Sequence, residues 1–420
     1  MKIRLWLQKQ NTLVLTFYLA FTSFSTYLCV YALRKPFTAG TYEGQELWGI
    51  DYKIVLVIAH VLGYATSKLL GIKYITEVTP QNRAKMISQM AFWGLLALFL
   101  FALIPPPYNF VMMYLNGLPL GMMYGLVLGN LEGRKVTEIL GAVLCVSFIF
   151  GAGVVKTVGR WLILDLNVSD YWMPFCAGAI FFLPLFIFNY LLSQAPPPSS
   201  ADQASRTVRL PMNAQARKIL FLKYWPGFVS LILVYVIVTI LRDIRENFAV
   251  EIFKEFNITD IGVFTFTETL VGLSVTLLVG FLFIVKDNRK ALWLNYLFVG
   301  VGMALVIVCT YFFRKEILSI TQWMILVGLG IYMAYVPYNC TLYERLIASS
   351  KEQTNISFLL YPADFCGYIG SVGIMLIKNF GEGNISWLNY YVKFAYSLPI
   401  VAMILMIFSL RYFHKKLPKD

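Results

Sequence analysis

The sequence has few charged residues, few histidines and no paired cysteines, and each shortage excludes a class of protein. Only 14% of its 420 residues are charged, whereas a soluble domain of this length carries nearer a quarter. Two histidines, His60 and His414, are too few for a His-rich metal cluster. The six cysteines lie scattered in apolar runs and never as CxxC pairs. We therefore predict neither a disulfide framework nor a zinc or other metal site.

The sequence also lacks the short motifs of common catalytic sites. It has no GxxxxGK[ST] phosphate loop, no GxSxG elbow and no HExxH pair. We therefore predict a protein that is not an enzyme and binds no cofactor. The net charge of +13 would be compatible with nucleic acid as a partner. However, the basic residues lie at the ends of apolar runs, which is typical of membrane topology, and we predict no nucleic-acid partner.

Long apolar runs follow one another along the whole chain. Hydrophobic residues make up 59% of the sequence, and a transmembrane helix needs about 20 mainly apolar residues. The first run has no small-residue cleavage site behind it, so we interpret it as a retained helix and not a signal peptide. We predict an all-α membrane protein with twelve spans at 12–38, 51–75, 86–104, 109–130, 138–159, 171–193, 225–250, 260–285, 291–313, 321–344, 354–378 and 388–411.

The connections predict two six-helix halves and an orientation. Residues 194–224 form a polar, proline-containing and basic segment, so we expect halves at 1–193 and 225–420 joined by this linker. If the N-terminus is cytoplasmic, the inside segments carry 21 Lys and Arg residues and the outside segments only 4. This bias predicts a multi-pass protein of the cell (inner) membrane with both termini and the linker in the cytoplasm.

Two stretches half a chain apart repeat one pattern of polar residues. In each, an aromatic hydroxyl, a second hydroxyl, an arginine and a fourth polar residue fall at i, i+4, i+7 and i+11, which places them on one helix face. The two sets are Tyr27, Tyr31, Arg34 and Thr38, and Tyr235, Thr239, Arg242 and Glu246. An arginine within a span is costly and usually functional. We hypothesise that Arg34 and Arg242 face each other across a pseudo-twofold axis and hold an anion.

Simpler interpretations of these stretches stay open. Arg34 and Lys35 could be an interfacial anchor that reaches the lipid headgroups, although the charge bias disfavours it on the outer side. Pro36 is expected to end or kink the helix. Asp243 and Arg245 could simply mark the place where span seven leaves the membrane.

Further polar residues form stripes at helical spacing in other spans. Span two carries His60, Tyr64 and Lys68, and span eleven carries Tyr361, Asp364 and Tyr368. Span eight contains Glu268. Buried charges of opposite sign should pair, and Asp364 and Glu268 could serve either in structural ion pairs or in transport. His60 could equally be an ordinary core histidine. Glycine clusters in spans four, five and eleven predict close helix packing.

Several of these stretches resemble the major facilitator superfamily, and within it the organophosphate:phosphate antiporter branch of glycerol-3-phosphate and hexose-phosphate transporters. The matching stretches are Tyr31-Ala-Leu-Arg34-Lys35-Pro36-Phe37, Leu241-Arg242, Gly63-Tyr64-Ala-Thr-Ser67-Lys68, Thr267-Glu268-Thr-Leu-Val-Gly272 and the glycines from Gly117 to Gly125. The resemblance implies a 6+6 helix bundle, two arginines that clasp a phosphate with help from lysines and a histidine, and a monomer.

The sequence also departs from this branch. The helix-five histidine of the branch falls at about Ser147, and its helix-seven acid falls on Asn247, beside Glu246. The superfamily's Gly-x-x-x-Asp-Arg loop is reduced around Gly71 to Glu77. The chain further resembles a group of bacterial membrane proteins of major-facilitator type that share the Arg-Lys-Pro-Phe and Arg-Glu-Asn-Phe stretches and have no assigned substrate.

From these observations we predict a secondary transporter that moves a small organic anion by alternating access, with a phosphate ester exchanged for phosphate. The predicted substrate-binding residues are Arg34, Arg242, Lys68, Tyr27, Tyr31, Tyr235 and Tyr64, and the predicted ion-pair or coupling residues are Lys35, Glu268, Glu246 and Asp364. Lys35 and Glu268 would form an ion pair that breaks during transport. The predicted partners are the solute and membrane lipid. One alternative is a proton-coupled carboxylate symporter using Asp364 or Glu268, and another is a sensor that kept the fold without transport.

Overall fold

The computed structural model describes residues 2–199, 202, 214–258, 260–350, 357–381 and 385–418. Arg206 and Arg209 of the predicted linker, and Lys351 and Lys419 of the charge count, lie outside the described residues. The chain divides into two compact units, which are described separately. Unit 1 comprises Met1–Arg206 with Ile258–Gly272, and unit 2 comprises Thr207–Asn257 with Leu273–Asp420.

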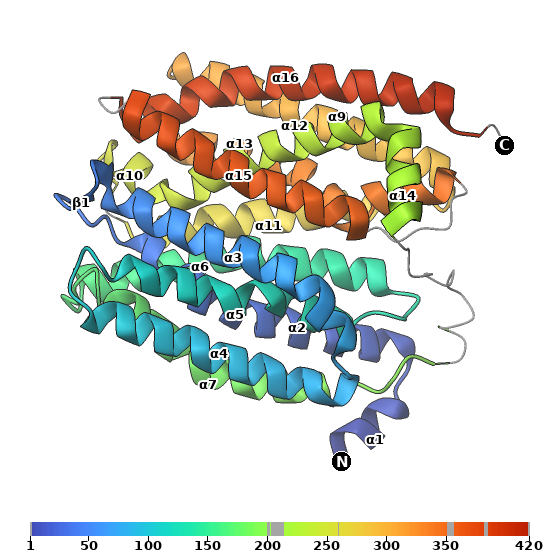
Figure 1. Cartoon of the computed structure of the whole chain (residues 1–420), viewed down its shortest axis with the longest axis horizontal. Coiled ribbons are helices and arrows are strands. Elements are labelled where there is room, and N and C mark those ends of the chain that lie inside the picture. Colours follow the sequence, from blue (N-terminus) through green and yellow to red (C-terminus); the bar gives the residue numbers. More distant parts are fainter. Residues whose placement is uncertain are drawn as a thin grey trace. The chain divides into compact units, whose positions relative to one another are not determined.

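Unit 1 is a bundle of long helices with a short helix at its start and a small hairpin (Figure 1). Its elements are α1 (Lys2–Gln8), α2 (Thr12–Arg34), the 3₁₀ helix η1 (Pro36–Ala39), β1 (Glu46–Leu47), β2 (Ile50–Asp51), α3 (Tyr52–Glu77), α4 (Pro80–Leu103), α5 (Phe110–Gly129), α6 (Thr137–Leu164), α7 (Met173–Ser193) and the beginning of α11 (Gly262–Leu282). The strands β1 and β2 pair antiparallel, with Glu46 opposite Asp51. Helix α2 packs against α6 and α7, and α3 packs against α5.

Unit 2 is also a helix bundle. Its elements are α9 (Ala214–Asn247), α10 (Ala249–Lys254), the rest of α11, α12 (Asn288–Arg314), α13 (Ile320–Cys340), α14 (Leu342–Ser350), α15 (Ser357–Gly381) and α16 (Trp387–Lys416). Helix α9 packs against α15 and α16, and α12 packs against α13. A kink at Tyr224, just before Pro226, divides α9 into two pieces, because a proline inside a helix removes one backbone hydrogen bond.

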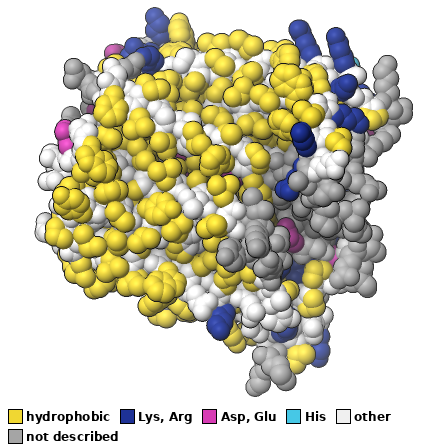
Figure 2. Space-filling view, in the orientation of Figure 1, with side chains coloured by type: hydrophobic (Ala, Val, Ile, Leu, Met, Phe, Trp, Pro, Cys, Tyr) yellow, Lys and Arg dark blue, Asp and Glu magenta, His cyan; other side chains and the backbone are white. Residues whose placement is uncertain are grey.

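Twelve helices within the described part of the chain are long and apolar enough to cross a membrane. They coincide with the twelve predicted spans, and the predicted all-α membrane class is confirmed. Their ends differ by several residues in places: α4 begins at Pro80 and α9 at Ala214, both earlier than predicted. The polar residues at these starts belong to the first turns of the helices and not to the loops. Figure 2 shows one face covered mainly by hydrophobic side chains, as a bilayer-facing surface requires.

The predicted break of the first helix at Pro36 is confirmed, and the regular helix ends before residue 38, the predicted end of the span. Helix α2 ends at Arg34, Lys35 is its C-cap, and Pro36 opens the 3₁₀ helix η1. The backbone N–H of Lys35 still donates to the Tyr31 carbonyl, at 3.0 Å between N and O. This change of direction places Arg34 at the end of a regular helix and Lys35 at the bend.

Glycines allow α3 and α5 to approach closely, as the glycine cluster of span four predicts. A Cβ atom placed on Gly63 would lie 2.1 Å from the Tyr114 carbonyl oxygen. One on Gly117 would lie 2.5 Å from the His60 carbonyl oxygen, and one on Gly121 would lie 2.5 Å from the Ser67 Cβ atom. Any larger residue at these places would push the two backbones apart. The crossing holds α3, and with it Tyr64 and Lys68, in a fixed position.

Candidate functional site

Two cations, one from α2 and one from α3, lie over a single tyrosine ring of α3 in unit 1. The Cζ atom of Arg34 is 3.8 Å from the centre of the Tyr64 ring, and the Lys68 Nζ atom is 5.5 Å from the same centre. Both distances allow a cation–π attraction. Tyr64 is the thirteenth of the 26 residues of α3. The ring therefore lies near the middle of a helix that is long enough to cross the bilayer.

A further basic side chain, Lys35, belongs to the same part of unit 1. Lys35 is only 4% exposed and lies close enough to His60 for the two to interact electrostatically. A buried lysine at this place does not behave as an anchor that reaches the lipid headgroups. The His60 and Tyr64 rings stack with their centres 6.4 Å apart. The predicted stripe His60, Tyr64 and Lys68 thus forms one continuous face of α3.

Tyr27 and Tyr31 complete the cluster from α2. The Tyr27 ring meets the Tyr124 ring of α5 edge-on, with centres 5.3 Å apart, and its hydroxyl is within hydrogen-bonding reach of Tyr64. The Tyr31 ring lies 5.8 Å from the Arg34 Cζ atom and packs against Gly151 of α6. All five predicted substrate-binding residues of unit 1 are therefore brought together, and we call them with Lys35 the Arg34 cluster.

In unit 2 the second arginine also lies over a tyrosine ring. The Arg242 Cζ atom is 4.3 Å from the centre of the Tyr335 ring of α13. Its Nε and Nη2 atoms donate to the Asp243 Oδ1 atom at 3.0 and 2.7 Å. Glu246, one turn further along α9, also interacts electrostatically with the guanidinium. Arg242 is thus a cation with acidic neighbours on its own helix.

Tyr235 links three helices beside this arginine. Its hydroxyl donates to the Asp364 carboxylate of α15 and lies 3.2 Å from the Tyr335 hydroxyl. The Tyr235 and Tyr335 rings stack with their centres 5.4 Å apart. Asp364 is only 3% exposed, so its carboxylate is held inside unit 2 by a hydrogen bond. We call Tyr235, Arg242, Asp243, Tyr335 and Asp364 the Arg242 cluster.

The repeat seen in the sequence extends to the neighbours of the repeated residues. Tyr27 meets a tyrosine of the fourth span, Tyr124, and Tyr235 meets a tyrosine of the tenth span, Tyr335. Tyr31 packs against a glycine of the fifth span, and Thr239 packs against Gly367 of the eleventh. The hydroxyl-bearing residues that precede each arginine in the repeat therefore make equivalent contacts in the two units.

Glu268, the predicted coupling residue of span eight, lies against α6 in unit 1. A Cβ atom placed on Gly153 would be 2.9 Å from the Glu268 Cβ atom and 2.5 Å from the Phe264 carbonyl oxygen. The Thr265 hydroxyl of α11 donates to the Thr157 hydroxyl of α6 at 2.7 Å. Buried Lys156 belongs to the same stretch of α6. The predicted ion pair between Lys35 and Glu268 stays a prediction.

Sequence reasoning missed several residues that belong to the two clusters or lie near them. Tyr124 and Tyr335 were not predicted, although each is an aromatic residue in an otherwise apolar span. Lys156 is a charge within a span, and this alone is a signal for a functional site. Asp243 was not among the predicted site residues, yet it is buried and bonded to Arg242. Arg245 is also buried, and its guanidinium donates to the Met324 carbonyl of α13 at 3.0 and 3.1 Å.

Residues 36–416 match a family described as a family of unknown function, DUF5690. The chain belongs to this family. The match covers nearly the whole chain, including Lys68, Arg242 and Asp364, and it begins just after Arg34 and Lys35. No protein with a curated description matches this DUF5690 chain.

Solved transporter structures resemble the DUF5690 chain in fold. A bacterial homologue of the human lysosomal transporter Spinster, in an inward-facing and unoccupied conformation, shares 12% identity with a TM-score of 0.64, covering 98% of this chain and 100% of the other. The peptide transporter POT with alafosfalin shares 14% identity with a TM-score of 0.60, covering 96% of both chains. The nucleoside transporter NupG shares 14% identity with a TM-score of 0.60, covering 95% and 100%.

These similarities show the fold of the major facilitator superfamily, as the sequence resemblance implied. At such low identity they show the fold alone, and the solutes named for these transporters do not carry over to the DUF5690 chain. In the place of the histidine of the antiporter branch, Ser147 is fully buried and its hydroxyl donates to the Leu144 carbonyl at 2.6 Å. Among the described residues, no three His, Cys, Asp or Glu side chains gather where they could hold a metal ion.

Proposed function

We propose that this chain is a secondary transporter that moves a small organic anion across the membrane by alternating access, with a phosphate ester exchanged for inorganic phosphate. The observation that carries the proposal is the pair of cations, Arg34 and Lys68, over the Tyr64 ring in the middle of a membrane-spanning helix. The major-facilitator fold supports the transport mode.

Arginine is well suited to bind an anion at this depth. Its guanidinium stays charged at all relevant pH values and presents a planar fork that can bind two oxygen atoms of a phosphate or carboxylate. A charge inside the bilayer is costly, so cations there are placed where they pair with other groups or with a solute. The Tyr64 ring orients Arg34 from one side through a cation–π contact.

The charge of the Arg34 cluster favours phosphate over a monovalent solute. A phosphate monoester carries nearly two negative charges at neutral pH. Arg34 and Lys68 together supply two positive charges at one ring, and Lys35 is buried close by. The resemblance of the Arg34-Lys35-Pro36-Phe37 stretch to the antiporter branch supports the same solute class. Tyr27, Tyr31 and Tyr64 supply hydroxyl groups for further hydrogen bonds.

In unit 2 we propose that Arg242 also binds the transported anion and exchanges partners when it does so. Its present partner, Asp243, holds it through two contacts to a single carboxylate oxygen. A solute phosphate would compete for the same N–H groups. Glu246 would take part in this exchange as a coupling residue, and the proposed breaking of a Lys35–Glu268 ion pair would have the corresponding role in unit 1. Tyr235 would donate to the solute when it releases Asp364.

One observation favours a second candidate function, proton-coupled symport of a carboxylate. The buried Asp364 carboxylate accepts a hydrogen bond from Tyr235, beside Arg242. A buried carboxylate that can take up a proton, next to an arginine that can bind an anion, suits a symporter. Under this alternative Asp364 would carry the proton, and Asp364→Asn would abolish proton coupling while leaving anion binding intact.

The first experiment is a thermal-stability screen of purified protein with phosphate, glycerol phosphate, hexose phosphates and plain carboxylates. A ligand at 100 times its Kd stabilises a folded protein by about 2.7 kcal/mol if it binds only the folded state. We expect stabilisation by phosphate esters in the wild type, lost in Arg34→Lys and Arg242→Lys. The matched control is Arg411→Lys, which changes an exposed arginine of α16.

Each other outcome would contradict the proposal in a different way. Stabilisation by carboxylates alone would favour the symporter, and stabilisation by none of the anions would make both arginines structural. Exchange of labelled phosphate across proteoliposomes then tests transport directly. Binding without any exchange or uptake would overturn transport and would favour a sensor.

A further inference from the structure

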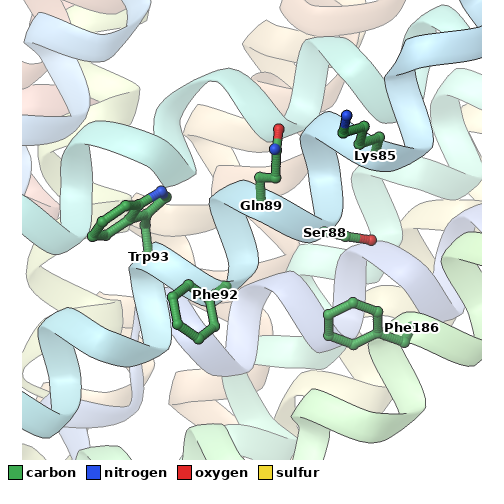
Figure 3. A pocket seen from close by; sticks show the side chains of 6 residues that line it. All are labelled: Lys85, Ser88, Gln89, Phe92, Trp93 and Phe186. Atoms are coloured by element: carbon green, nitrogen blue, oxygen red, sulfur yellow. The ribbon is translucent and has the colours of Figure 1, made fainter.

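A groove of about 410 Å³ lies on the outer surface of unit 1, between α4 and α7. Five of its lining residues, Lys85, Ser88, Gln89, Phe92 and Trp93, come from α4, and Phe186 comes from α7 (Figure 3). The five α4 positions are spaced i, i+3, i+4, i+7 and i+8, which places them on one face of the helix. This groove is separate from the Arg34 cluster, and none of its lining residues belongs to the proposed transport site.

The chemistry of the groove changes in order along α4. Lys85 lies near the start of the helix, and the amide of Gln89 follows about 6 Å further along the axis. The rings of Phe92 and Trp93 lie about 10 to 12 Å from Lys85 along the same axis. Figure 3 shows Lys85 toward one end of this row and Trp93 toward the other, with Phe186 beside them. A cation, then an amide and then aromatic rings thus follow one another from the helix start into the bilayer.

The floor of the groove is built by polar contacts between the two helices. The Asn189 side chain of α7 donates to the Ser88 hydroxyl at 3.0 Å and to the Ala84 carbonyl at 2.8 Å. Asn189 itself is buried, so these contacts fix the spacing of α4 and α7. The rings above the floor stay open to the surroundings: Phe92 is 53% exposed and Trp93 60%. The groove therefore has a fixed floor and an open mouth toward the lipid.

Ordinary lipid-facing positions of a span are apolar, because a polar group in hydrocarbon lacks hydrogen-bond partners. Gln89 is exposed on this face, about two and a half turns into a helix that is long and apolar enough to cross the membrane. Its amide needs a polar partner at this depth, and the ester groups of a phospholipid lie just below the headgroup phosphate. The Lys85 ammonium, at the end of the groove nearest the start of α4, suits a negatively charged headgroup.

We propose that this groove binds one anionic diacyl phospholipid. The Lys85 ammonium binds the headgroup phosphate, the Gln89 amide donates to a glycerol ester carbonyl, and the acyl chain lies over Phe92, Trp93 and Phe186. The order of these groups along α4 matches the order of phosphate, ester and acyl chain in such a lipid. This site does not depend on the proposed transport function.

Native mass spectrometry of delipidated protein tests the proposal with phosphatidylglycerol and phosphatidylcholine of the same acyl chains. We expect tighter binding of phosphatidylglycerol, reduced about fivefold in Lys85→Gln, which corresponds to about 1 kcal/mol for one lysine near an anionic lipid surface. The matched control is Lys9→Gln, an exposed lysine in the turn before α2. Equal weakening by both substitutions, or equal affinity for the two lipids, would show diffuse attraction and overturn a defined site.

A second measurement tests the acyl chain. Phosphatidylglycerol with brominated chains should quench the fluorescence of Trp93, so Trp93→Phe should remove a saturable part of the quenching seen in the wild type. Glycerol phosphate and inorganic phosphate should not displace the lipid, because neither has an acyl chain to fill the aromatic part of the groove. Displacement by either, or unchanged quenching in Trp93→Phe, would overturn the lipid assignment.

Discussion

The Arg34 and Arg242 clusters share one plan but differ in charge. In both, an arginine from the first membrane-spanning helix of its unit lies over a tyrosine ring. The Arg34 Cζ atom is 3.8 Å from the centre of the Tyr64 ring, and the Arg242 Cζ atom is 4.3 Å from the centre of the Tyr335 ring. In unit 1 the ring is shared with a second cation, Lys68. In unit 2 the arginine is bonded to a carboxylate, Asp243, on its own helix. The repeat has kept the position of the arginine, but the ring under it comes from the second span in unit 1 and from the tenth span in unit 2, and the charges around the two arginines differ.

This difference assigns distinct tasks to the two arginines within the proposed function. The two cations over Tyr64 make unit 1 attractive to an anion from the start. In unit 2 an incoming anion must replace Asp243, and breaking a buried ion pair is costly unless another anion takes its place. The Arg242 cluster is therefore suited to respond to solute binding, and the Arg34 cluster to capture the solute.

The largest effect is expected from replacing the arginines themselves. Arg34→Lys and Arg242→Lys should each abolish exchange in proteoliposomes, because lysine lacks the planar fork that binds two oxygen atoms. The loss of anion affinity should be greater for Arg34→Lys, at least about tenfold, since lysine keeps the charge but loses a charge-assisted hydrogen bond of the fork, worth about 1.5 to 3 kcal/mol. Normal exchange by both folded variants would exclude these residues from the transport site. Equal losses of affinity would contradict the difference between the two clusters.

The next largest effect is expected from removing the carboxylate that holds Arg242. Asp243→Asn should lower the free energy of unfolding by about 3 kcal/mol without solute, because it leaves a buried guanidinium without its ionic partner. An anionic solute should restore part of that loss, and the measurement is thermal unfolding with and without phosphate. Asp165→Asn, at the exposed C-cap residue of α6, whose capping bond is made by its backbone N–H, is the control and should change stability by less than about 0.5 kcal/mol. A neutral Asp243→Asn variant would show that Arg242 does not depend on this pair.

Much of the fold was predictable because its signals are local. Hydrophobicity over about 20 residues locates each span, and Pro36 marks the end of α2 because proline cannot donate the next hydrogen bond. Helical spacing placed Tyr27, Tyr31 and Arg34 on one face, and all three lie in one cluster. The hairpin of Glu46 to Asp51 was missed because its strands have only two residues each and carry no alternating pattern.

The partners of the arginines were not predictable, because they come from other helices or from side-chain conformation. No spacing along the chain relates Arg242 to Tyr335, which meet only when α9 packs near α13. Residues i and i+1 point in different directions on a helix. The hydrogen bond from Arg242 to Asp243 therefore depends on the rotamers of the two side chains, which helical spacing does not predict. The sequence repeat predicted equivalent arginines, and it carried no information on their opposite charge environments.

A smaller loss of stability, similar in the two units, is expected from replacing the glycines that pack against Tyr31 and Thr239. A Cβ atom on Gly151 would lie 3.2 Å from the Tyr31 Cβ atom, and one on Gly367 would lie 3.0 Å from the Thr239 Oγ1 atom. Gly151→Ala and Gly367→Ala should each cost about 1 to 3 kcal/mol of stability through overpacking. Gly373→Ala, where nothing lies within 4 Å, should be neutral or stabilising by up to about 1 kcal/mol. A cost at only one of the two cluster glycines, measured by thermal unfolding, would limit the repeat to the arginines and to the ring pairs Tyr27–Tyr124 and Tyr235–Tyr335.

The smallest effect separates the ring from the hydroxyl at the two tyrosines. Tyr64→Phe and Tyr335→Phe keep the ring under the arginine and remove a hydroxyl that lies within reach of Tyr27 or Tyr235. Each should cost about 1 kcal/mol or less, as expected for one hydrogen bond. Tyr64→Leu and Tyr335→Leu also remove the cation–π attraction and should cost a further 0.5 to 2 kcal/mol, roughly. If the Phe and Leu variants of one tyrosine lose the same free energy of unfolding, the hydroxyl and not the ring orients the arginine of that unit. The two clusters would then not share the contact between arginine and ring.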